Sequence, residues 1–247
     1  MSQQEATTPI KIGFLVTTER ASLIYDDPTV LRRSRKQALS IRAVQACPAV
    51  NDFEKRSLVV AMPYNLRLRC IKHNDEYALE AIAPGTRIDE DLLRDHVMLM
   101  EPQFWRDPSK PVIQIKAPYL TVCDEQAYVT QTPPFLDYKG DRWPGTVVTG
   151  RFRFDYWPRT LSWAFEWCDI SKDLVLKKGE PWFYLLFEHD NPDRDIQFVR
   201  AKDTKELKAY REALTDVVKF VSNPFSLKER AMQRRPAKLL EEEAPNA

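Results

Sequence analysis

Two of the three histidines stand in a pattern that could bind a metal ion. His73 and Asp75 form a His-x-Asp motif, and His189 follows much later, at the end of an apolar stretch. Two imidazoles and one carboxylate suit Fe(II), because they leave coordination positions open for oxygen and a co-substrate. Arg200 lies 11 residues after His189 and could form a bidentate pair with a co-substrate carboxylate. We therefore consider His73, Asp75 and His189 as metal ligands and Arg200 as a cofactor-binding residue.

The same residues also fit an interpretation without metal. The sequence His-Asn-Asp-Glu at 73–76 is typical of a hairpin turn, since Asn and Asp side chains stabilise tight turns. Residues 190–194 likewise have the composition of a turn after a strand. The arrangement of His73, Asp75, His189 and Arg200 resembles that of the iron(II)/2-oxoglutarate oxygenases. This resemblance implies Fe(II) and 2-oxoglutarate as cofactors. The sequence does not distinguish between a metal site and ordinary turn residues.

Aromatic residues are dense between positions 152 and 184. They pack well in strands and bury a large area, so one interpretation is the core of a β-sandwich. The other is an apolar ligand cleft lined by Tyr156, Trp163, Trp167 and Trp182. Arg151 and Arg153 alternate with this aromatic series, and they could bind an anion or simply remain solvated on an exposed strand.

Composition narrows the classes of function. The 247 residues carry 37 Lys and Arg against 36 Asp and Glu, a balance that argues against a dedicated nucleic-acid binder. There is no G-x-G-x-x-G or G-x-x-x-x-G-K-[ST] motif, which argues against the common nucleotide-binding loops. The four cysteines show no C-x-x-C spacing, and the longest apolar run, at 182–187, is too short to span a bilayer. We expect a cytoplasmic protein with a small-molecule or protein partner and no membrane association; the oligomeric state is not indicated.

The pattern of short strands predicts the fold class. Strands are expected at 65–71 and 77–82, as a hairpin, and at 182–187, as a central apolar strand. Apolar spacing predicts helices at 88–100 and 204–222, the second with Asp203 or Thr204 as N-cap. Because the strands follow one another without alternating helices, we predict a mainly β (α+β) fold. The expected core is an antiparallel β-sandwich, a jelly roll or a clip-like barrel, with a few short helices and a C-terminal helix.

The domain prediction has three parts. Residues 1–9 are expected to be disordered, and residues 10–223 are expected to form a single β-rich domain that ends in a helix. Residues 224–247 are polar and charged, so we expect a disordered or marginally helical tail.

Several segments together resemble a known family. They are 46–53 (ACPAVNDF), 57–68 (SLVVAMPYNLRL), 115–119 (IKAPY) and 176–182 (LKKGEPW). Their order is similar to that in DUF6065, a family of uncharacterised phage and bacterial proteins, over about residues 10–200. Prolines carry much of this likeness: the chain has 18 prolines and only six glycines. The resemblance implies a fold but no activity, so the first functional expectation is a binding or accessory protein, with the oxygenase as the alternative.

Overall fold

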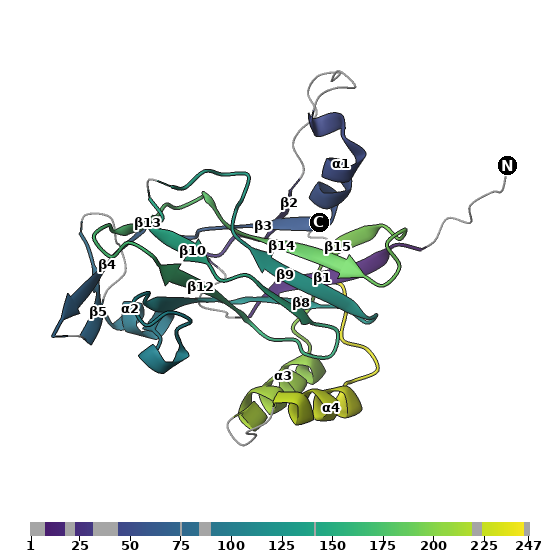
Figure 1. The fold of residues 1–247 in the computed structure, drawn as a ribbon. Helices are drawn as coiled ribbons and strands as arrows, with labels where there is room; N and C mark the ends of the chain where they lie inside the picture. The colour runs from purple at the N-terminus through teal and green to yellow at the C-terminus, as the bar shows by residue number, and fades with distance from the viewer. Residues whose placement is uncertain are drawn as a thin grey trace.

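The protein is built mainly from β-strands, with helices at the periphery (Figure 1). The computed structural model describes residues 8–17, 23–31, 44–74, 76–83, 90–140, 142–218 and 224–244. The strands form four open sheets, and none of the described sheets closes into a barrel. The mainly β (α+β) class with a sandwich core is therefore confirmed, and the barrel alternative is not.

The four sheets differ in their number of strands and in how the strands pair. The five-stranded sheet has the order β11-β9-β14-β3-β2 (Gly150–Arg153, Ala127–Thr132, Pro181–His189, Ser57–Ala61, Thr29–Val30). The four-stranded sheet has the order β10-β12-β7-β6 (Gly145–Val147, Leu161–Trp167, Val112–Ala117, Val97–Leu99). The parallel-pair sheet has the order β15-β1-β8 (Ile196–Arg200, Ile10–Val16, Tyr119–Val122), and the hairpin sheet has the order β13-β4-β5 (Leu174–Leu176, Leu66–His73, Glu76–Ala81). Only the pairing of β1 with β15 is parallel among these strands.

The helices are short, apart from those near the C-terminus. They are α1 (Pro48–Lys55), α2 (Glu90–His96), α3 (Lys205–Val218) and α4 (Pro224–Arg234), with 3-10 turns η1 (Val44–Ala46) and η2 (Pro102–Phe104). Figure 1 shows α3 and α4 together on one side of the sheets, with α1 on the opposite side. None of the helices in the described ranges is long and apolar enough to cross a membrane.

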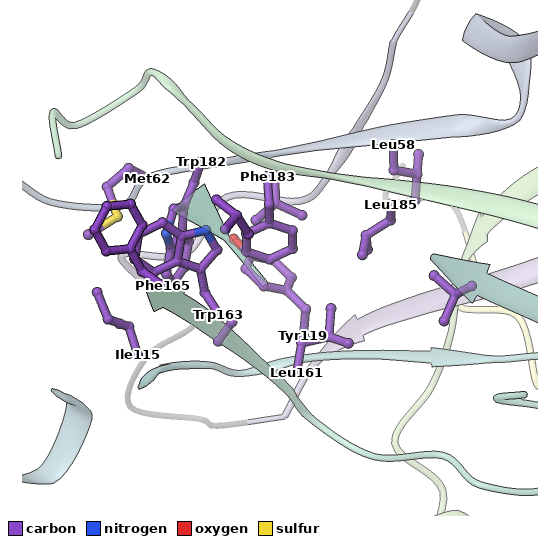
Figure 2. Packing of buried hydrophobic residues seen from close by; sticks show 14 of the residues in the cluster. Leu58, Met62, Ile115, Tyr119, Leu161, Trp163, Phe165, Trp182, Phe183 and Leu185 are labelled. Carbon is purple, nitrogen blue, oxygen red and sulfur yellow. The ribbon is translucent and has the colours of Figure 1, made fainter. Parts of the chain in front are cut away.

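The main core lies between the five-stranded and four-stranded sheets. Alternate residues of β12, namely Leu161, Trp163 and Phe165, meet Phe183 and Leu185 of β14 (Figure 2). These five side chains are at most 4% exposed. Since burying one large apolar side chain contributes roughly 1.5–3 kcal/mol, this cluster dominates the stability of the sandwich.

A second apolar cluster lies between the parallel-pair sheet and the C-terminal helices. Its members include Leu15, Leu120, Val122, Leu207, Leu214, Leu239 and Leu240. The carboxylate of Asp124 accepts hydrogen bonds from the backbone N–H groups of Leu239 (2.6 Å) and Leu240 (3.1 Å). The polar tail expected after residue 223 thus contains helix α4, and its Leu239 and Leu240 are buried against the sheet.

Gly13 allows this tail to approach β1 closely. A Cβ atom added at Gly13 would clash with the side chain of Leu240 and would lie 2.9 Å from side-chain atoms of Ala201 and Val122. No residue with a side chain fits there without a shift of its neighbours. The position of Leu240 therefore depends on the absence of a side chain in the middle of β1.

The helix predictions had different outcomes. Helix α3 begins where expected, and the hydroxyl of Thr204 caps it by accepting the N–H of Leu207 at 3.1 Å. The helix predicted at 88–100 is shorter: α2 covers Glu90–His96, and Val97–Leu99 pairs with β7 as β6. Tertiary pairing overrides helical spacing there, because Val97 fills the core from an extended backbone.

Candidate functional site

The two histidines considered as iron ligands lie on different sheets. His73 is the exposed last residue of β4 in the hairpin sheet, opposite Glu76, and Asp75 lies outside the described residues. His189 ends β14 in the five-stranded sheet. In the described ranges, no group of three or more His, Cys, Asp or Glu side chains is placed to hold a metal ion. Because Asp75 lies outside the described residues, the triad itself stays a prediction, and the structure shows only that its two histidines belong to different sheets.

His189 and Arg200 have other partners instead. The Nδ1 atom of His189 accepts the backbone N–H of Asn191 at 2.9 Å, as expected for a residue beginning a turn. Arg200 forms ion pairs with Asp27 (2.8 Å) and Glu243 (2.6 Å). A guanidinium held by two carboxylates is already neutralised, so Arg200 is poorly suited to bind a co-substrate carboxylate.

Of the four residues predicted to line an aromatic cleft, three lie in the core and one lines a pocket. Trp163, Trp167 and Trp182 are all 0% exposed, and the rings of Trp163 and Trp182 pack with their centroids 5.9 Å apart. These three tryptophans are core residues, and the prediction that they line an open cleft is wrong. The fourth residue, Tyr156, is only 3% exposed but does line a pocket.

This pocket lies where the edge strand β11 meets helix α4. It has a volume of about 340 Å³ and is lined by Arg151, Phe152, Arg153, Tyr156, Trp157, Arg159 and Lys228. Tyr156 is nearly fully buried and lies at its base, whereas Phe152 and Trp157 are half-buried. We call it the basic pocket, because four of its seven lining residues are cations.

Two of these four cations already have acidic partners. Arg151 pairs with Glu188 at 2.8 Å, and Arg153 pairs with the buried Asp155 at 2.6 Å. The hydrogen bonds to Glu188 and Asp155 raise the pKa of Arg151 and of Arg153, respectively. The guanidinium of Arg153 also lies 4.7 Å from the ring centroid of Tyr156. Arg153 is therefore fixed in place and orients the base of the pocket.

The other two cations, Arg159 and Lys228, are exposed and have no hydrogen-bond or ion-pair partner among the described residues. Both side chains carry only donors and are positively charged at neutral pH. The basic pocket thus has two positive charges that no described carboxylate offsets. These two charges stand beside aromatic surface, which is the environment that an anion with an apolar body requires.

Hydrogen bonds hold α4 against the wall of the basic pocket. The hydroxyl of Tyr210, in α3, lies 2.7 Å from the carbonyl oxygens of both Tyr156 and Ala231 and shares its one proton between them. Arg235, just after α4, donates from Nε to the carbonyl oxygen of Asp155 at 2.6 Å. Because these bonds join α3, α4 and segment 155–156, Lys228 is brought to the pocket from a distant part of the chain.

Sequence reasoning identified only part of this site. It singled out Arg151 and Arg153 as possible anion ligands and Tyr156 as a cleft residue, and all three line the basic pocket. It missed Arg159 and Lys228. Arg159 follows Trp157 and Pro158 closely enough to have been noticed, whereas Lys228 lies in a segment with the composition of a tail.

No protein-family model matches the chain, and no curated protein matches it by sequence. The likeness to DUF6065 therefore remains a prediction from the residues alone.

Proposed function

We propose that this protein is a binding protein for a small anion with a flat apolar group, and that the basic pocket is its binding site. The observation that carries the proposal is the position of Arg159 and Lys228, two cations without a partner among the described residues, beside the aromatic side chains of Tyr156 and Trp157. A phosphate, sulfonate or carboxylate would lie between the cations, and the apolar group would contact the aromatic rings.

Size and rigidity support this choice of ligand. A volume of about 340 Å³ lies at the lower end of the range of roughly 300–1,000 Å³ that is usual for small-molecule sites. The base of the pocket is fixed by the Arg153–Asp155 ion pair, so little ordering is needed on binding. The role is that of a binding or accessory protein. We expect it in the cytoplasm, in keeping with its four free thiols.

The test compares three probes by isothermal titration calorimetry. The first, 2-naphthyl phosphate, carries both a dianion and a flat apolar group; 2-naphthol lacks the anion, and inorganic phosphate lacks the rings. We expect 2-naphthyl phosphate to bind at least about tenfold more tightly than either of the others, since each half supplies about 1.4 kcal/mol or more. Equal affinity for 2-naphthol and 2-naphthyl phosphate would contradict the proposal.

A variant places the binding at the basic pocket. Trp157→Ala removes a half-buried ring that lines the pocket and packs at the edge of the second apolar cluster. We expect this variant to bind 2-naphthyl phosphate about three- to tenfold more weakly. The matched control, Phe104→Ala, removes an aromatic ring that is 65% exposed and does not line the pocket, and it should leave the affinity unchanged.

A further inference from the structure

A second surface, distinct from the basic pocket, lies along strand β15. This strand pairs with β1 on one side, and none of the other named strands pairs with it. Edge strands carry unpaired N–H and C=O groups, which can bind a further strand. The hydrogen bonds between β15 and β1 show which backbone N–H and C=O groups of β15 point away from β1.

The backbone N–H and C=O groups of the odd-numbered residues from 195 to 201 point toward β1. The carbonyl oxygen of Asp195 accepts the N–H of Ile10, and the N–H of Ala201 donates to the carbonyl oxygen of Phe14, both at 2.9 Å. Successive residues of a strand direct their backbone groups to alternate edges. The N–H and C=O groups of the even-numbered residues 196, 198 and 200 therefore point to the outer edge.

The C-terminal segment already uses the first of these outer groups. The N–H of Glu243 donates to the carbonyl oxygen of Arg200 at 2.9 Å, and Ala201 stands opposite Glu242 in an antiparallel bridge. If the pairing continued in this register, residue 245, which lies outside the described residues, would be opposite Phe198. Position 245 is a proline, which has no N–H to donate. A proline in that position could not supply the N–H that the carbonyl oxygen of Phe198 would accept.

A groove of about 370 Å³ begins where this pairing stops. Its lining comprises Ile196, Gln197 and Phe198 of β15 together with Val30, Asp52, Lys55, Arg56 and Asp195. The half-buried Ile196 and Phe198, with Val30, form an apolar wall, and the charged residues contribute two acids and two bases. The groove therefore offers backbone hydrogen bonds and apolar contact and has no excess of charge.

We propose that the outer edge of β15 at Ile196–Phe198 binds an extended segment of a partner protein, which adds as an antiparallel strand. Antiparallel addition lets one partner residue exchange both backbone hydrogen bonds with Phe198 and another do so with Ile196. Partner residues opposite these two face the apolar wall, so Val or Ile is favoured there. The residue between them stands opposite the exposed Gln197 and is polar.

The first test builds such a strand into the chain's own C-terminal residues. Pairing is then intramolecular, so the result does not depend on the affinity of a separate peptide. The variant Pro245→Val, Asn246→Thr, Ala247→Val places Val, Thr and Val opposite Phe198, Gln197 and Ile196. The control carries only Asn246→Thr and Ala247→Val, so it keeps the proline. We expect amide hydrogen exchange at Ile196 and Phe198 to slow by about tenfold in the triple variant and to be unchanged in the control.

The second test supplies the strand as a separate molecule. The peptide acetyl-Ser-Val-Thr-Val-Ser-amide should slow exchange at the same two amides of the wild-type protein, and the same peptide with N-methylated valines should not. The triple variant should no longer respond to the peptide. The proposal is overturned if Ile196 and Phe198 exchange as slowly as Gln197 in the free wild-type protein, if the triple variant shows no slowing, or if the peptide gives none.

Discussion

The hydroxyl oxygen of Tyr210 lies 2.7 Å from the carbonyl oxygen of Tyr156, so helix α3 is bonded directly to the base of the basic pocket. The same hydroxyl contacts the carbonyl oxygen of Ala231 in α4. Tyr210 does not line the pocket and is only 7% exposed. A buried residue outside the pocket therefore determines how α4, with Lys228, is placed relative to the aromatic side chains.

Removal of this hydroxyl by Tyr210→Phe should lower the free energy of unfolding by about 1–2 kcal/mol, because the one proton shared between two buried carbonyl groups is lost. It should also weaken binding of 2-naphthyl phosphate, since Lys228 is held less firmly. Urea denaturation and calorimetry measure the two effects. Tyr138→Phe, at an 89% exposed tyrosine, is the matched control; equal stability of the two variants would contradict the assigned role.

The same tyrosine predicts a pH dependence of stability. Burial raises the pKa of Tyr210 to about 12, whereas an unfolded tyrosine titrates near pH 10. The folded state thus favours the protonated phenol, and this contribution is complete below about pH 10 and is lost as the pH rises to about 12. We expect the difference in unfolding free energy between wild type and Tyr210→Phe to be constant up to about pH 10 and to shrink above it. A difference that stays constant up to about pH 12 would contradict this assignment.

Gly13→Ala tests the packing of the C-terminal tail. The added methyl group would clash with Leu240, so we expect the unfolding free energy to fall by about 1–3 kcal/mol. Gly150→Ala is the matched control in another strand, because a Cβ atom there meets nothing within 4 Å. Thermal or urea denaturation of both variants gives the comparison, and a Gly13→Ala protein as stable as the control would show that the tail does not pack on β1.

Local patterns predicted the elements well where apolar and polar residues alternate or where apolar residues form a short continuous run. The hairpin expected at 65–71 and 77–82 is β4 with β5, and the apolar run at 182–187 is the central strand β14. The parallel pairing of β1 with β15 could not be predicted, because it joins residues far apart in the sequence, with no crossover pattern to indicate it.

The basic pocket was only partly predictable for the same reason. Arg151, Arg153 and Tyr156 share one stretch of sequence, so their proximity could be expected. Lys228 reaches them only because the bonds of Tyr210 and Arg235 dock α4, and the composition of that segment indicated a tail. The aromatic pattern likewise could not separate Trp163 in the core from Trp157 at the pocket, since both occur in similar aromatic surroundings.

The most direct test of the proposed function is the affinity for 2-naphthyl phosphate after Arg159 and Lys228 are both neutralised. The double variant Arg159→Gln, Lys228→Gln should bind about tenfold or more weakly than wild type, which corresponds to a loss of about 1.4 kcal/mol. The matched control, Lys208→Gln, removes an exposed helical lysine that does not line the basic pocket and should bind as wild type does. Equal affinity of the double variant and the wild type would contradict the assignment of the basic pocket as an anion-binding site.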